Sequence, residues 1–156
     1  MKIPNWKTAS ELAAVASIVL SLVYVGFELR ENSAISRSDA YNTYAISVSE
    51  NQANLALDPT LSSLMARAFR GAEPNEFTAD EQFRISIFLQ SILRLQEGLF
   101  QSVSEGILSE EHLGLVSGAG AWNNPFFRQI WLRGFRVNYT SEFVDYFESL
   151  DWNTQN

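Results

Sequence analysis

Cysteine is absent from the 156 residues, and histidine occurs once, at His112. Without cysteine the chain forms no disulfide and offers no thiolate ligand or thiol nucleophile. A di-iron site in a helical bundle takes two Glu-x-x-His pairs, which one histidine does not supply. We therefore expect no enzyme activity, no cofactor and no metal site, and we interpret His112 as a surface residue near the start of a helix.

Basic residues are also few, with 11 Lys and Arg against 18 Asp and Glu and a net charge of −7. A nucleic-acid-binding protein needs a basic face that contacts the phosphates. An acidic chain of this kind lacks the charge for that role, so we expect no nucleic-acid partner.

Neither glycine nor proline occurs between Glu28 and Leu57. Apolar or aromatic residues recur there at helical spacing, at Tyr41, Tyr44, Val48 and Leu55. The pattern predicts a long amphipathic helix that continues from the preceding apolar segment, about 50 residues in all. A break near Asn32 and Ser33, which are weak helix formers, is the alternative.

The run Leu12–Phe27 contains no charged residue. As a helix it would cover about 24 Å, and its flanks from Trp6 to Leu29 would extend it toward the roughly 30 Å of a bilayer core. Glu28 follows the run where a signal peptide would have its small-residue cleavage site, so we predict an uncleaved anchor. The alternative is a core helix of a soluble domain. On the membrane interpretation, residues 1–30 form the anchor and residues 31–156 form a helical domain.

Small residues occupy every fourth position of this run, at Ala9, Ala13, Ser17 and Ser21. Close approach of two helices in lipid requires small side chains, so this face predicts a helix–helix contact in the membrane. The alternative is that alanine and serine are ordinary components of an anchor.

Helix start and stop signals divide the rest of the chain. Asp58 before Pro59 starts a helix that Gly71 ends, and Thr78 with Glu81 forms a capping box for a helix to about Ser104. Its predicted apolar face consists of Phe83, Ile87, Phe88, Ile92, Leu95, Leu99 and Val103. Further helices are predicted from Ser109 to Gly118, from Asn124 to Gly134 and from Thr140 to Ser149. The predicted fold class is all-α: one N-terminal transmembrane helix that runs into the long amphipathic helix, with a small helical bundle packed on it.

Arg94 and Glu97 stand three residues apart on the most apolar helix, a spacing that allows them to pair on one face. We interpret them as a structural pair that fixes the register of the helix. The functional alternative is a polar ligand pocket between helices.

The one basic and aromatic stretch holds Phe126, Phe127, Arg128, Trp131, Arg133 and Arg136. Such a stretch can lie on an anionic membrane surface or dock a partner. The alternative is a core helix whose arginines extend outward.

Three segments, SIVLSLVYVGFELRENS, DPTLSSLMARAFRG and LRLQEGLFQSVSEGILSEE, resemble a group of small bacterial proteins of uncharacterised activity. In that group a short N-terminal hydrophobic helix precedes a helical domain. The resemblance implies an all-helical, membrane-anchored protein and implies no activity. The stretch Gly118–Gly120 departs from the pattern of the group.

These observations together predict a membrane-anchored interaction or assembly subunit. Its expected partners are the lipid bilayer and either further copies of itself or a larger membrane complex. Two alternatives remain, an oligomeric pore or channel and a small-ligand-binding helical domain. The expected location is the cell membrane with a single span, and the Arg30 flank together with the basic stretch near Trp131 favours a cytoplasmic body.

Overall fold

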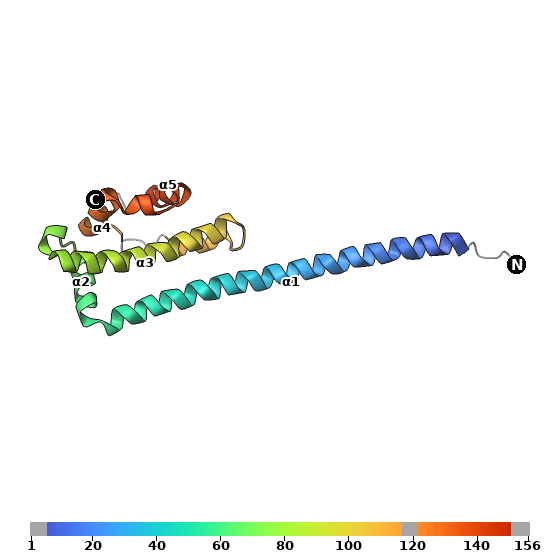
Figure 1. Ribbon diagram of the computed structural model, residues 1–156, viewed down its shortest axis with the longest axis horizontal. Coiled ribbons are helices and arrows are strands. Elements are labelled where there is room, and N and C mark those ends of the chain that lie inside the picture. The colour runs from blue at the N-terminus through green and yellow to red at the C-terminus, as the bar shows by residue number, and fades with distance from the viewer. Residues whose placement is uncertain (1–5, 117–121, 151–156) are drawn as a thin grey trace. The chain divides into compact units, whose positions relative to one another are not determined.

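The structure is a computed structural model that describes residues 6–116 and 122–150 (Figure 1). Within those ranges the chain is helical and contains no strand, so the all-α prediction is confirmed. The helices are α1 (Trp6–Leu57), α2 (Pro59–Phe69), α3 (Ala79–Ser104), α4 (Pro125–Arg133) and α5 (Ser141–Ser149). Three short 3₁₀ helices lie between them, η1 (Pro74–Glu76), η2 (Glu110–Leu115) and η3 (Phe135–Asn138).

The chain divides into two compact units, Met1–Asp39 and Ala40–Asn156. We call the second unit the body. The division falls after Asp39, later than the boundary after Arg30 that the end of the apolar run suggests. Helix α1 is continuous through Asn32 and Ser33, so the predicted long helix is confirmed and the alternative of a break at these residues is excluded.

Local capping explains where three helices begin. The Asp58 carboxylate accepts a hydrogen bond from the Leu61 N–H at 2.9 Å, and Pro59 occupies the first turn of α2. At α3 the Thr78 N–H donates to Glu81 at 2.8 Å, which is the reciprocal bond of a capping box. Asn124 accepts from the Phe127 N–H at 2.8 Å and starts α4. The predicted starts of these helices are thus confirmed.

The segment after Ser109 differs from its prediction. The structure forms the 3₁₀ helix η2 there, not an α-helix. The Ser109 hydroxyl does not cap the backbone, because it donates to the Glu111 carboxylate at 2.8 Å and contacts the His112 ring nitrogen at 3.0 Å. The predicted end of this segment at Gly118 lies outside the described residues.

An aromatic core lies inside the body. Phe126, Phe127, Trp131, Phe143 and Phe147 are at most 1 % exposed. Leucines of α3 and Leu64 and Met65 of α2 complete the core. Ala40, Tyr44 and Leu55 of α1 pack against it while remaining partly exposed.

Helix α3 buries a face that overlaps the predicted one only in part, since Phe88 and Leu99 are buried as predicted. Phe83 and Ile87 are 67 % and 51 % exposed, whereas Ile85 and Leu93 are fully buried. The helix carries two apolar arcs, since residues two apart lie about 200° from each other around a helix. The core within the body covers the arc of Ile85, so the prediction was wrong for Phe83 and Ile87.

Candidate functional site

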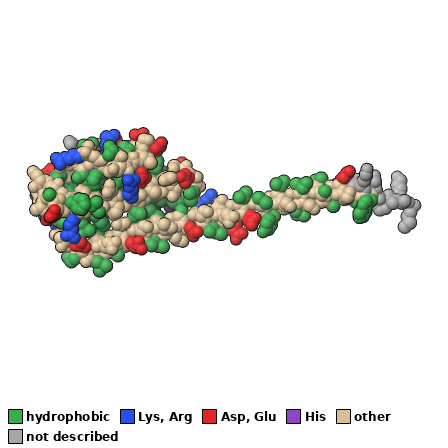
Figure 2. Space-filling model, in the orientation of Figure 1, with side chains coloured by type: hydrophobic (Ala, Val, Ile, Leu, Met, Phe, Trp, Pro, Cys, Tyr) green, Lys and Arg blue, Asp and Glu red, His purple; other side chains and the backbone are tan. Residues whose placement is uncertain are grey.

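The apolar run of α1 is exposed along its whole length. Leu20 and Phe27, for example, are 69 % and 68 % exposed, and apolar side chains follow one another along this part of the helix (Figure 2). Within the described residues, α1 is the helix that is long and apolar enough to cross a bilayer. Its composition makes it a candidate membrane span.

The small-residue face of α1 is the first sequence-predicted site. Ala9, Ala13, Ser17 and Ser21 are all exposed, and no large side chain occupies these positions. The Ser17 hydroxyl donates to the Ala13 carbonyl at 2.8 Å, and the Ser21 hydroxyl donates to the Ser17 carbonyl at 2.8 Å. Each serine proton is therefore satisfied inside the helix, and the face offers a shallow groove with no unpaired donor.

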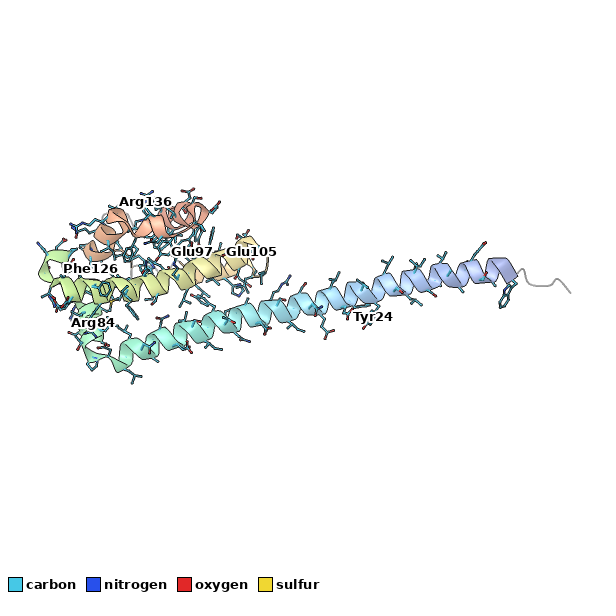
Figure 3. All side chains as sticks on the ribbon, in the orientation of Figure 1. Tyr24, Arg84, Glu97, Glu105, Phe126 and Arg136 are labelled. Atoms are coloured by element: carbon cyan, nitrogen blue, oxygen red, sulfur yellow. The ribbon has the colours of Figure 1, made fainter. Side chains whose placement is uncertain are left out.

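Arg94 and Glu97 form the second predicted site, and they do pair. Their charged atoms lie 2.7 Å apart, with the Arg94 side chain half exposed. Glu97 also accepts a hydrogen bond at 2.8 Å from the main-chain N–H of Thr140, the residue before α5. Thr140 makes no side-chain cap of its own, so a carboxylate of α3 binds the start of α5 (Figure 3). We call this contact the Glu97 latch.

Tyr139 completes the surroundings of the latch. The Arg94 guanidinium lies 4.6 Å from the centre of the Tyr139 ring. Tyr139 is 8 % exposed, and its hydroxyl has no hydrogen-bond partner in the described structure. Burial raises the pKa of Tyr139 to about 12, although the nearby Arg94 opposes that shift. The phenol is therefore neutral at physiological pH.

The basic and aromatic stretch is the third predicted site, and most of its apolar residues do not reach the surface. Phe126, Phe127 and Trp131 are core residues with at most 1 % exposure. The prediction that they contact a membrane surface or partner was wrong, because helix α4 buries its aromatic arc against α5 and Trp122.

The arginines of the same stretch differ in exposure: Arg136 is exposed, whereas Arg128 is partly buried and its Nε has no hydrogen-bond partner in the described structure. Arg128 hydrogen-bonds to Asn123, and Arg136 lies 3.5 Å from Glu148, which also accepts from the Trp131 indole N–H at 3.0 Å. Arg133 is exposed. The alternative prediction, a core helix whose arginines extend outward, fits the buried aromatic residues and the exposed Arg133 and Arg136.

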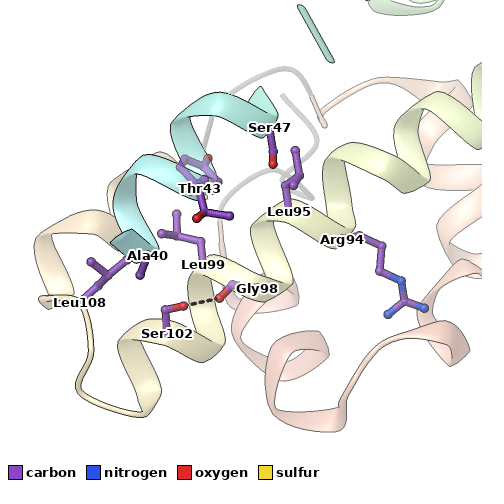
Figure 4. Close-up of a pocket in the computed structure, with 10 residues that line it drawn as sticks. Ala40, Thr43, Ser47, Arg94, Leu95, Gly98, Leu99, Ser102 and Leu108 are labelled. Atoms are coloured by element: carbon purple, nitrogen blue, oxygen red, sulfur yellow. Dashed lines mark hydrogen bonds between the residues drawn. The ribbon is translucent and has the colours of Figure 1, made fainter. Parts of the chain in front are cut away.

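Two hollows lie within the body, between the second half of α1 and α3. The first, of about 290 Å³, is lined by Ala40, Thr43 and Ser47 of α1 and by Gly98 and Ser102 of α3. Ser102 uses its hydroxyl within α3, where it donates to the Gly98 carbonyl at 2.9 Å (Figure 4). Arg94 stands at the edge of this hollow and extends away from Ala40 and Thr43, since it pairs with Glu97. Glu97 does not line this hollow. The hollow is therefore not the predicted alternative of a polar pocket built on Arg94 and Glu97.

The second hollow, which we call the Gln96 groove, has a volume of about 250 Å³. Its apolar walls include Tyr44, Val48 and Leu55 of α1, Phe69 of α2, and Phe88 and Ile92 of α3. Gln96 also lines it, is 6 % exposed, and has an amide oxygen without a hydrogen-bond partner in the described structure.

Sequence reasoning missed Gln96 as a buried residue. Its position three residues after Leu93 and three before Leu99, both buried, is the signal that could have found it. The signal was missed because the predicted apolar face of α3 included Phe83 and Ile87, which are exposed, and omitted Leu93, which is buried.

Among residues 6–116 and 122–150, no three carboxylate or imidazole groups lie close enough together to hold a metal ion. His112 packs against Tyr41 with ring centres 5.5 Å apart and contacts the Ser109 carbonyl at 3.1 Å. The imidazole of His112 thus contacts an aromatic ring and Ser109.

No protein-family model matches this chain, and neither the curated proteins nor the solved structures contain a significantly similar one. The function is therefore argued from the residues of this chain alone.

Proposed function

We propose that this protein is a membrane-anchored assembly subunit, held in the bilayer by the first part of α1 and self-associating through its small-residue face. The observation that carries the proposal is the exposure of an uncharged helical run from Leu12 to Phe27. Each large apolar side chain left in water costs about 1.5–3 kcal/mol relative to burial. A run of this length therefore calls for an apolar surrounding.

The helix geometry supports a bilayer as that surrounding. From Trp6 to Leu29 the helix is unbroken, and at 1.5 Å per residue this segment covers about 36 Å, enough to cross the roughly 30 Å of a hydrocarbon core. Trp6 near one end and Tyr24 near the other are residue types that favour the membrane–water interface. Glu11 and Glu28 flank the run and can direct their carboxylates to the headgroups. The apolar run Leu12–Phe27 lies inside α1, beyond its first turn, so its backbone groups are hydrogen-bonded within the helix, as hydrocarbon requires.

The face of Ala9, Ala13, Ser17 and Ser21 supports self-association. Residues four apart drift by only about 40° around a helix, so these positions form one slowly winding groove. A second helix can approach this groove closely, and helix–helix packing then replaces lipid contacts. Since the hydroxyl protons of Ser17 and Ser21 are already bonded inside the helix, the attraction comes mainly from close packing.

Particle mass in detergent, measured by light scattering, tests the proposal. The double substitution Ala13→Leu with Ser17→Leu fills the groove, and we expect the particle to fall to a smaller oligomer or a monomer. The matched control is Val15→Leu with Val19→Leu, about 200° away around the helix from Ser17, which should leave the mass unchanged. An unchanged mass for the first variant would contradict self-association through this face. A ring of many copies in the unmodified protein would favour the pore alternative.

A further inference from the structure

The Gln96 groove combines an apolar wall with a buried amide and carries no charge. Its lining residues, from α1, α2 and α3 of the body, include no Asp, Glu, Lys or Arg. A charged ligand would lose its hydration there with no opposite charge in return. The groove therefore selects against carboxylates, phosphates and ammonium groups.

Gln96 supplies the polar contact that gives such a groove specificity. It is nine-tenths or more buried, and its amide oxygen has no hydrogen-bond partner in the described structure. An unsatisfied buried acceptor costs free energy, which a donor placed in the groove would recover. Two other amide side chains line the groove. Gln52 is exposed, and Asn51 already donates to the Ser47 carbonyl at 3.2 Å and accepts from the Ser91 hydroxyl at 2.9 Å. Gln96 is thus the buried amide of this groove with an acceptor to offer.

The amide of Gln96 can adjust to a ligand. The terminal torsion of a glutamine side chain is soft and has no narrow staggered wells. Rotation about this torsion lets the oxygen accept from a donor placed in the groove, which Gln96 lines.

We propose that the Gln96 groove binds an uncharged, mostly apolar small molecule with one hydroxyl group, such as a medium-chain alcohol. The apolar chain packs against Val48, Leu55, Phe88 and Ile92, and the hydroxyl donates to the Gln96 oxygen. The volume of about 250 Å³ lies near the lower end for ligand pockets, which limits the ligand to a small molecule. Ligand binding is independent of self-association through α1.

Photolabelling of the full chain in lipid nanodiscs tests this proposal. Three diazirine probes share one hydrocarbon chain: an analogue of 1-octanol, the same chain without the hydroxyl, and the corresponding carboxylate. Mass spectrometry of the digested protein locates the label. The alcohol probe should label the groove segments of α1 and α3 roughly three- to tenfold more than the hydrocarbon probe, the range that one net hydrogen bond gives. The carboxylate probe should label them least.

Substitutions at two positions, each with a matched control, assign the effect to the groove. Gln96→Leu should remove the preference for the alcohol, while Gln101→Leu, at an exposed glutamine of the same helix, should keep it. Val48→Phe should fill the groove and reduce labelling by all three probes, while Ile46→Phe, at an exposed position of α1, should not. Circular dichroism verifies that each variant is folded.

Several results would overturn the proposal. Equal groove labelling by the alcohol and hydrocarbon probes in the unmodified protein would mean that water, not a ligand, satisfies Gln96. Absence of label from both groove segments would exclude the site. A preference for the alcohol that survives Gln96→Leu would exclude Gln96 as the acceptor.

Discussion

The Tyr139 ring packs inside the body, with its centre 5.7 Å from the centre of the Trp131 ring and 5.8 Å from that of Phe143. The folded chain holds the pKa of this phenol at about 12, above the ordinary value of 10.0, because burial disfavours the tyrosinate anion. The unfolded chain ionises at the ordinary value. The stabilisation is thus complete below about pH 10 and is lost as the pH rises toward 12.

We expect the Tyr139→Phe variant to lose less stability than the unmodified protein between pH 10 and 12. The difference has an upper limit of roughly 2–3 kcal/mol, from about 1.4 kcal/mol per pKa unit. Denaturant unfolding of the full chain in detergent at several pH values provides the measurement. Tyr41→Phe, at a 43 % exposed tyrosine, is the control and should behave like the unmodified protein. Parallel stability–pH curves for Tyr139→Phe and the unmodified protein would contradict this account.

The burial of Gln96 and Tyr139 was not predicted from the sequence. Both are polar residues that the fold buries. The burial of Gln96 depends on which face of α3 packs in the core, and that of Tyr139 depends on how α4 and α5 pack. Helical spacing restricts the choices without deciding between two apolar arcs on one helix. The pairing of Arg94 with Glu97 was predictable because it is local, whereas the contact of Glu97 with Thr140 joins residues 43 positions apart.

At the scale of elements, the helix starts were the most predictable feature. The caps at Asp58, Thr78 and Asn124 use side chains within three residues of the backbone groups that they satisfy. The segment after Ser109 carries a similar signal but forms a 3₁₀ helix, and there the serine hydroxyl bonds to Glu111 and contacts His112 instead of capping the backbone.

The Glu97 latch joins two elements, α3 and α5. Glu97→Ala removes both its ion pair with Arg94 and its hydrogen bond from Thr140, so we expect a loss of roughly 1.5–3 kcal/mol, the usual contribution of a hydrogen bond to a charged group. Glu97→Gln keeps an acceptor for the Thr140 N–H and should lose less. Thermal unfolding followed by tryptophan fluorescence gives the comparison.

Glu105 offers the control for the latch. It is an exposed carboxylate at the end of α3 (Figure 3), where it accepts a hydrogen bond from Gln101 at 2.8 Å. Glu105→Ala should therefore change the stability little. Equal effects of Glu97→Ala and Glu105→Ala would show that the latch contributes nothing beyond a surface interaction.

At the scale of the whole molecule, the two units differ in burial and composition. The body has an aromatic core and an acidic sequence. The unit Met1–Asp39 has no buried side chain among its described residues, and its apolar run suits a bilayer. The sequence predicted this contrast because composition alone distinguishes the two parts. It also predicted one long helix of about 50 residues, and α1 runs from Trp6 to Leu57 without a break at Asn32 and Ser33, although both are weak helix formers.

The central claim is that Leu12–Phe27 lies within the bilayer, and cysteine accessibility tests it most directly. Because the chain has no cysteine, single substitutions Ser10→Cys, Ser17→Cys and Ser33→Cys each introduce one unique thiol. Membrane vesicles of both orientations are treated with a membrane-impermeant maleimide. We predict that the thiols at positions 10 and 33 react from opposite sides, and that the thiol at position 17 reacts only after detergent is added. Reaction at position 17 in intact vesicles as fast as at position 33 would contradict the membrane span.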